Sequence, residues 1–126
     1  KGKEEIMSWR LLVVDDSPEF LSLVREFLGS HPDVTIVAEA SSAEVALELV
    51  DKTSVNAALI DLHLPGRNGL WAAQTVLHTY PHIRVILMSA TWDQSYDVLA
   101  KAVGARGFLR KKAFSAEAVL RLLGER

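Results

Sequence analysis

The feature that most constrains the fold of this chain is a fivefold alternation of short apolar runs with amphipathic segments of helical spacing. The apolar runs, each a predicted strand, cover residues 10–15, 34–38, 57–61, 83–88 and 105–109. Runs bounded by turn residues in this way are typical of strands buried on both faces of a parallel sheet. Alternating strands and helices imply right-handed crossovers. The sequence therefore predicts an α/β fold, five (βα) units doubly wound on one parallel five-stranded sheet.

Two of the predicted strands end in acidic residues. The first run leads into Asp15 and Asp16, and the third ends in Asp61. In open α/β sheets, ligands bind beyond the carboxyl ends of the strands, where the strand order reverses. In the order 2-1-3-4-5 the first and third strands are neighbours, so the three carboxylates would share one small space. Unpaired carboxylates repel one another, and oxygen ligation of a hard divalent cation such as Mg²⁺ would relieve that repulsion.

The composition limits the class of protein. A length of 126 residues suits one domain, and 49% apolar residues against 24% charged ones indicate a globular chain. A net charge of −2 predicts no basic surface for nucleic acid, and the absence of cysteine excludes disulfides and thiolate chemistry. No apolar run approaches the roughly 20 residues of a membrane-spanning helix. We therefore expect a cytoplasmic protein that binds neither nucleic acid nor a membrane directly. Residues 1–8 are expected to be a loose end or an addition to the natural chain.

Local signals place the helix starts. Ser17 before Pro18, and Ser115 before the last amphipathic segment, are typical of N-caps. Ser41 and Glu44 fit a capping box for the second helix.

The fourth helix is expected over residues 93–103, ended by Gly104. Trp92 and Tyr96 are four residues apart, so they would lie on one face of that helix. They would be partly buried there, or would form an exposed contact patch.

Four short motifs follow one another in order, each at the end of a predicted strand. They are the acidic pair Asp15-Asp16, DLHLPGRNG from Asp61, MSA from Met88 and GARGFLRK from Gly104. Together they resemble the receiver domain of bacterial two-component response regulators, over residues 9–124. The segment VAEASSAEVAL from Val37 and the GFLRK ending look closest to receivers with a helix-turn-helix DNA-binding output. The resemblance also implies the flavodoxin-like sheet order 2-1-3-4-5.

The resemblance implies roles for the acidic residues. Asp61 would accept a phosphoryl group from a sensor histidine kinase. Asp16, Asp61 and the backbone carbonyl of His63 would hold Mg²⁺, with Asp15 acting largely through water. The physics agrees, because a carboxylate is a nucleophile that can form an acyl phosphate, and the transfer needs neutralised phosphoryl oxygens.

The resemblance also implies roles for three residues on the fourth and fifth strands. Ser89 would be a catalytic and switch hydroxyl, although alone it would also fit a helix cap. Phe108 would be the switch aromatic, and Lys111 would pair with a phosphoryl oxygen. Many receivers place a cis-proline after this lysine, whereas this chain has Lys112. Strand alternation sends neighbouring side chains to opposite sides, so we expect Lys111 and not Lys112 in the pocket.

The expected function is a signalling phosphoacceptor rather than an enzyme with a separate substrate, with intrinsic self-phosphorylation and dephosphorylation. Phosphorylation of Asp61 would switch the conformation and control an output domain or partner, expected to be transcriptional. Any DNA-binding domain would lie outside this chain. A homodimer would form through the face of the fourth helix, fifth strand and fifth helix.

Two other functions stay open from the sequence. One is a metal-dependent phosphohydrolase or nucleotide enzyme on a similar sheet. The chain lacks a DxD pair after a strand, a GxGxxG loop and a GxxxxGK[ST] loop, which speaks against it. The other is a receiver-like interaction module that signals without phosphorylation, against which the complete set of polar site residues argues.

Overall fold

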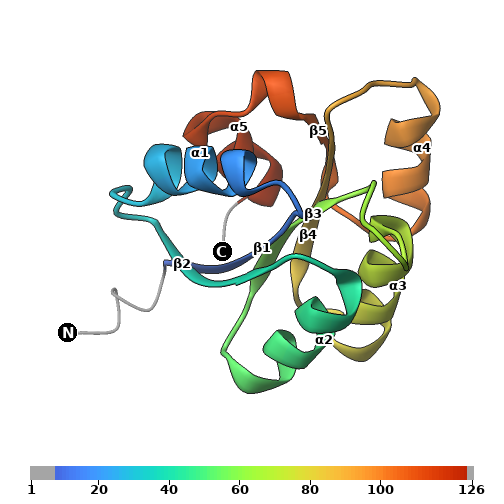
Figure 1. Ribbon diagram of the computed structural model, residues 1–126, viewed down its shortest axis with the longest axis horizontal. Helices are drawn as coiled ribbons and strands as arrows, with labels where there is room; N and C mark the ends of the chain where they lie inside the picture. The colour runs from blue at the N-terminus through green and yellow to red at the C-terminus, as the bar shows by residue number, and fades with distance from the viewer. Residues whose placement is uncertain (1–7, 125–126) are drawn as a thin grey trace.

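The structure is a computed structural model that describes residues 8–124, and it is a parallel sheet with helices on both faces (Figure 1). The strand order is β2-β1-β3-β4-β5, so the predicted fold and order are confirmed. The expected loose end at residues 1–8 lies, apart from Ser8, outside the described residues. None of the helices between residues 8 and 124 has the length and apolar character of a membrane-spanning segment.

The elements are β1 (Trp9–Val14), α1 (Pro18–Leu28), β2 (Val34–Ala40), α2 (Ala43–Lys52), β3 (Ala57–Asp61), α3 (Gly69–Thr79), β4 (Arg84–Ser89), α4 (Ser95–Ala102), β5 (Gly107–Arg110), a 3₁₀ turn (Lys111–Ala113) and α5 (Ala116–Leu123).

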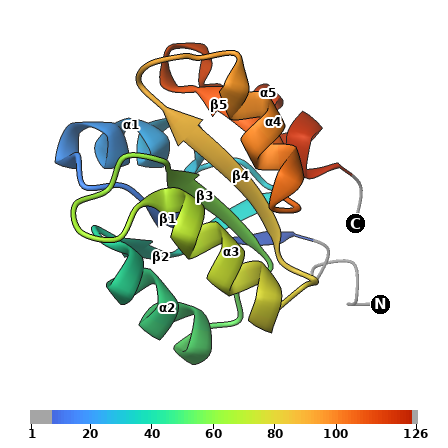
Figure 2. The same cartoon turned by 90° about the vertical axis from the view of Figure 1, so that its right-hand side faces the viewer.

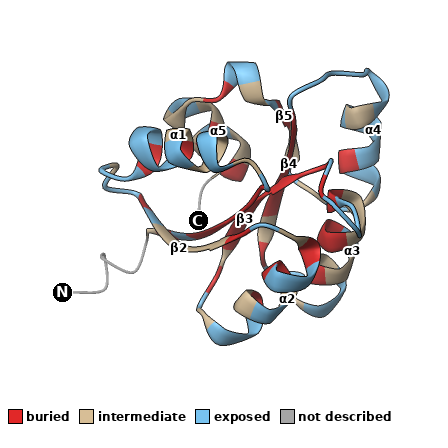
Figure 3. Cartoon of the chain, viewed as in Figure 1, coloured by how far each residue is buried: buried red, intermediate tan, exposed pale blue. Residues whose placement is uncertain are grey.

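The two faces of the sheet carry separate cores, because neighbouring residues of a strand point to opposite sides. On β1, Leu12 and Val14 belong to the core under α2, α3 and α4, whereas Leu11 and Val13 belong to the core under α1 and α5. Figures 1 and 2 show these two groups of helices on opposite faces of the sheet. Burial concentrates on the central strands, and β3 is buried along its whole length (Figure 3). The central strands therefore lie between the two cores, and packing on both faces fixes the positions of their carboxyl ends.

The predicted helix starts are confirmed at α1 and α5 and wrong by one residue at α2. The hydroxyls of Ser17 and Ser115 accept hydrogen bonds from backbone N–H groups in the first turns of α1 and α5. At α2 the N-cap is Ser42 rather than Ser41, and its hydroxyl accepts from the backbone N–H of Val45 at 3.2 Å. Two adjacent serines offer the same capping chemistry, so the choice between them depends on where the chain leaves β2.

The fourth helix begins later than predicted. It covers Ser95–Ala102, so Trp92 lies in the preceding loop and not on the same helical face as Tyr96. The side chain of Asp93 accepts a hydrogen bond from the backbone N–H of Ser95, which forms a local turn ahead of the helix. Trp92 is 48% exposed.

The fifth strand also begins two residues later than predicted. Gly104 has a φ of 88°, a left-handed conformation that ends the α4 region. The backbone N–H of Ala105 then bonds to the carbonyl of Ala100, so Ala105 still belongs to the turn. The strand is Gly107–Arg110, and Lys111 lies in the 3₁₀ turn that follows it.

Gly69 allows α3 to start directly against the end of β3. A Cβ atom at this position would lie 1.9 Å from the backbone carbonyl oxygen of Asp61, which is far inside van der Waals contact. The backbone N–H of Gly69 bonds to the carbonyl of Leu62 at 3.0 Å and closes the loop between them. Only glycine fits here, because the obstructing atoms are backbone and cannot turn aside.

We therefore expect Gly69→Ala to lower the free energy of unfolding by about 2–3 kcal/mol, since the new methyl group must displace backbone. Gly107→Ala is the matched control. Its Cβ would meet the tip of the Leu122 side chain, which can rotate away, so the loss should be about 1 kcal/mol or less. Urea unfolding of both variants measures this difference through the midpoint at constant slope. Equal losses would contradict the close approach at Gly69.

Candidate functional site

Three carboxylates gather where β1 and β3 end. Side-chain oxygens of Asp15, Asp16 and Asp61 lie within 4.8 Å of one another, which confirms the predicted cluster. Asp15 is fully buried and Asp61 is 4% exposed, whereas Asp16 is open to solvent. The cluster forms because β1 and β3 pair in parallel, with Val14 opposite Ile60, so their carboxyl ends meet at one edge.

Local turns fix the two buried carboxylates. Asp15 Oδ1 accepts a hydrogen bond from the backbone N–H of Ser17 at 2.9 Å. Asp61 Oδ1 accepts one from the backbone N–H of His63 at 3.1 Å. Each aspartate thus bonds to the backbone two residues ahead, the turn geometry that its short side chain favours. The second oxygen of each carboxylate is left to face the site.

Lys111 meets both of these second oxygens. Its Nζ atom lies 2.6 Å from Asp15 Oδ2 and 3.1 Å from Asp61 Oδ2, and its side chain is 14% exposed. Lys112 is exposed. Lys111 enters the site from the 3₁₀ turn after β5, and therefore not through the strand alternation on which the sequence argument rested.

The charges at this edge of the sheet perturb one another. Burial raises the pKa of Asp15 above its ordinary value, although the Lys111 ammonium and the Ser17 N–H oppose that shift. Burial alone would lower the pKa of Lys111, but its contacts with Asp15 and the charge of Asp61 raise it overall. The lysine is therefore firmly protonated, and it compensates much of the negative charge that the sheet collects here.

Ser89 lies at the end of β4, one residue beyond the partner of Asp61 in the sheet. It is fully buried. Its hydroxyl accepts a hydrogen bond from the backbone N–H of Thr91 at 3.1 Å and lies 3.1 Å from the Thr91 hydroxyl. Since α4 begins only at Ser95, Ser89 is not its cap.

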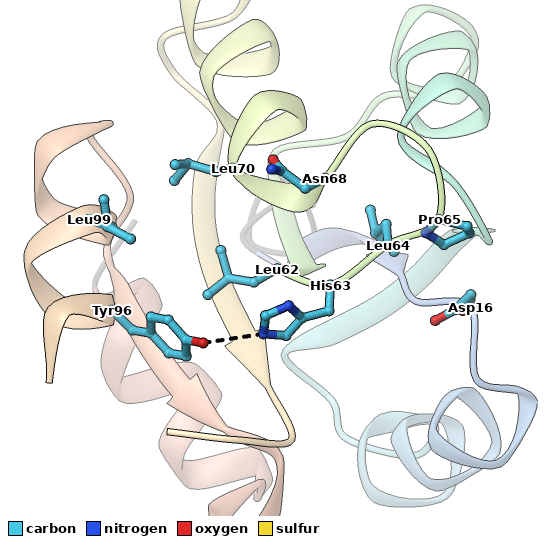
Figure 4. Close-up of a pocket in the computed structure, with 9 residues that line it drawn as sticks. All are labelled: Asp16, Leu62, His63, Leu64, Pro65, Asn68, Leu70, Tyr96 and Leu99. Carbon is cyan, nitrogen blue, oxygen red and sulfur yellow. Dashed lines mark hydrogen bonds between the residues drawn. The ribbon is translucent and has the colours of Figure 1, made fainter. Parts of the chain in front are cut away.

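Phe108 belongs to a chain of aromatic side chains that the sequence did not reveal. Its ring centroid lies 5.2 Å from that of Tyr96, and the Tyr96 ring lies 6.0 Å from the imidazole of His63. The Tyr96 hydroxyl also lies 3.4 Å from His63 Nε2 (Figure 4). Phe108 is half-buried against the core under α2, α3 and α4. These contacts connect the loop after Asp61 with α4 and β5.

A cleft of about 470 Å³ opens next to Asp16 and the loop that follows Asp61 (Figure 4). The polar side chains of its lining are Asp16, His63, Asn68 and Tyr96. The remaining lining is apolar and consists of Leu62, Leu64, Pro65, Leu70 and Leu99. The sequence missed this cleft, because its walls come from the β3–α3 loop and from α4, which only the fold brings together.

The fold is a doubly wound α/β domain. Its candidate site is a cluster of three carboxylates, two of them in contact with Lys111, at the point where the strand order reverses. The family model for the response regulator receiver domain matches residues 11–123. The chain belongs to this family, as its motifs indicated.

Known relatives and one solved structure support the same assignment. The transcriptional regulatory protein DegU of Brevibacillus brevis is 31% identical over 103 residues, covering 82% of this chain and 44% of DegU. The nitrate/nitrite response regulator NarL of Escherichia coli K12 is 32% identical over 101 residues, covering 80% of this chain and 47% of NarL. The signal receiver domain of NarL from Mycobacterium tuberculosis superposes with a TM-score of 0.83 at 33% identity, covering 94% of this chain and 98% of that one.

These similarities support the expected subfamily, response regulators of the transcription-regulator type. The chain spans less than half the length of DegU and of the Escherichia coli NarL.

The ion contacts of Lys111 lead to a stability prediction. Lys111→Ala removes the charge that offsets the buried carboxylates, so the free energy of unfolding should fall by about 1–3 kcal/mol at neutral pH. The loss should shrink as the pH falls, because protonated carboxyls no longer repel one another. Lys112→Ala, one residue along and exposed, should change stability by less than about 0.5 kcal/mol. Urea unfolding at several pH values tests this, and equal effects of the two substitutions would contradict it.

Proposed function

We propose that this chain is a phosphoacceptor signalling domain in which Asp61 takes a phosphoryl group from a sensor histidine kinase. The observation that carries the proposal is the Lys111 ammonium, held 2.6 Å and 3.1 Å from two carboxylates at the switch point of a receiver fold. A lysine placed there can stabilise a carboxylate before transfer and a phosphoryl oxygen after it.

The transfer needs a well-oriented carboxylate as nucleophile and positive charge to neutralise the phosphoryl oxygens. An oxygen of Asp61 forms a bond to the phosphorus of a phosphohistidine, while the phosphorus–nitrogen bond breaks. The histidine ring leaves with that electron pair and takes up a proton. The backbone N–H of His63 orients Asp61 through its bond to Oδ1, and Lys111 offsets the charge on the phosphoryl oxygens.

The donor set fits Mg²⁺. Three clustered carboxylates offer hard oxygen ligands, and the exposure of Asp16 leaves room for the several waters that this ion keeps. Asp16, Asp61 and the backbone carbonyl of His63 would hold the ion, with Asp15 acting largely through water. When bound, Mg²⁺ would neutralise charge on the phosphoryl oxygens.

The response to phosphorylation is proposed to pass through Ser89 and Phe108. The Ser89 hydroxyl would leave Thr91 for a phosphoryl oxygen, and Phe108 would move with it. The output would be a partner or a DNA-binding domain outside this chain, as the transcriptional relatives suggest. The protein would act in the cytoplasm, with a homodimer through α4, β5 and α5. It would not be an enzyme with a separate substrate, beyond its own phosphorylation and dephosphorylation.

Phosphoryl uptake is tested by intact mass after incubation with Mg²⁺ and phosphoramidate. We expect the wild-type chain to gain one phosphoryl group, and Asp61→Asn, which keeps the shape but loses the nucleophile, to gain none. Asp33→Asn, an aspartate before β2, is the control and should be labelled as wild type. Full labelling of Asp61→Asn would reject the acceptor. Donor hydrolysis without a retained group would favour a phosphohydrolase, and neither label nor hydrolysis would favour a phosphate-independent module.

Metal binding is tested by titrating the unphosphorylated chain with Mg²⁺ and following its amide NMR spectrum. We expect one weak site, with shifts centred on the ends of β1 and β3. Asp16→Ala removes a direct ligand and should weaken binding by about tenfold or more. Asp33→Ala should bind as wild type. Unchanged binding in Asp16→Ala would show that the ion is held elsewhere.

A further inference from the structure

The ring of Phe20 lies against the ammonium of Lys111. Lys111 Nζ is 4.6 Å from the centroid of this ring, within the range of a cation–π contact. The helical spacing of Phe20, Val24 and Leu28 alone would place Phe20 simply on the apolar face of α1. In the structure it sits in the first turn of α1, where its backbone N–H donates to the Ser17 hydroxyl at 3.2 Å. The turn that leaves Asp15 and Asp16 therefore also fixes the position of the ring.

Phe20 also supports the turn that carries Lys111. Its ring meets the buried ring of Phe114 edge to face, with centroids 5.5 Å apart and planes at 78°. The backbone N–H of Phe114 donates to the carbonyl of Lys111 and closes the 3₁₀ turn. Phe114 packs in turn on Phe27 of α1 at 5.9 Å. The turn after β5 is thus anchored on α1 by aromatic packing, and its lysine contacts Phe20 of the same helix.

A lysine ammonium needs such guidance more than an arginine would. It is a point charge on a flexible four-carbon stem and can swing between partners. The carboxylates attract it from one side, and the electron-rich face of Phe20 attracts it from another. The ring accepts no conventional hydrogen bond, so it holds the ammonium while leaving its N–H donors to oxygen acceptors. The low exposure of Lys111 strengthens such a contact, because less water competes for the charge.

We propose that Phe20 is a positioning residue for Lys111, a role that rests on the proposed function of Asp61 as phosphoryl acceptor. Its aromatic face keeps the ammonium between Asp15 and Asp61, ready for a phosphoryl oxygen. Core packing alone would require only an apolar side chain of similar size. The two accounts therefore differ in what they predict for a leucine at this position.

The first test reads the contact directly in the unphosphorylated chain by NMR of ¹³C-labelled lysine. The Cε protons of Lys111 should show an upfield ring-current shift, which disappears in Phe20→Leu and remains in Phe20→Tyr. Phe27→Leu is the matched control, since it removes an aromatic neighbour of Phe114 but no contact of Lys111, and it should leave the signal in place. An unchanged Lys111 signal in Phe20→Leu would overturn the contact. Because this test involves no phosphate, its result does not depend on the proposed function.

The second test measures the rate of Asp61 labelling by phosphoramidate in Mg²⁺. We expect Phe20→Leu to slow labelling about three- to tenfold, the size of one partly buried cation–π contact, and Phe20→Tyr to stay near the wild-type rate. In a Lys111→Ala background, Phe20→Leu should cause no further loss, because the two residues act through one contact. Additive losses, or equal rates for the leucine and tyrosine variants, would overturn the role. A wild-type chain that takes up no label would overturn the proposed function and the part of Phe20 in transfer, while the NMR result would still decide the contact.

Discussion

The ion contact between Lys111 and the buried carboxylates is the interaction on which the rest of this structure depends. The sheet brings three negative charges within 4.8 Å at one edge, an arrangement that costs free energy unless a cation is close. The lysine lies in the turn that follows the edge strand β5, and it must reach back past the end of β4 to Asp61 on β3. The position of the Lys111 ammonium therefore depends on the order of the strands, the short β5, the 3₁₀ turn and the aromatic packing of that turn on α1.

Much of the fold was predictable because its determinants are local and strong. Five apolar runs predicted five strands, and β1 and β3 fell within a residue of the expected bounds. The errors fall at exposed or short elements. The starts of α4 and β5 shifted by two residues because side-chain and left-handed turns at Asp93 and Gly104 hold the chain outside regular structure. Hydrophobic periodicity does not report such local turns, so it does not by itself place the starts of these two elements.

The candidate site also has features that the sequence predicts and features that it does not. The gathering of Asp15, Asp16 and Asp61 follows from the strand ends, which the apolar runs predicted, and from the strand order, which the resemblance to receiver domains implied. The contacts around them do not. An amphipathic pattern describes Phe20 only as a core residue, and it cannot show that the ring faces a lysine that is 91 positions further along the chain. Likewise no spacing connects His63 with Tyr96, which meet because α4 packs beside the loop after β3.

Two aromatic contacts flank the site, one from α1 and one from α4, and the two helices differ in how much of their surface is buried. The contact between Phe20 and Phe114 joins α1 to the turn that carries Lys111, whereas the contact between Tyr96 and His63 joins α4 to the loop after Asp61. The helix α4 has no side-chain cap at its start, and Ala100 is its one buried residue within the described chain. Elements with little buried surface open at low free energy. A phosphoryl group on Asp61 would add charge beside both contacts, and α4 can move at the lower cost. We therefore expect the proposed signal to leave the site on the Tyr96 side, while the Phe20 side keeps the lysine in place.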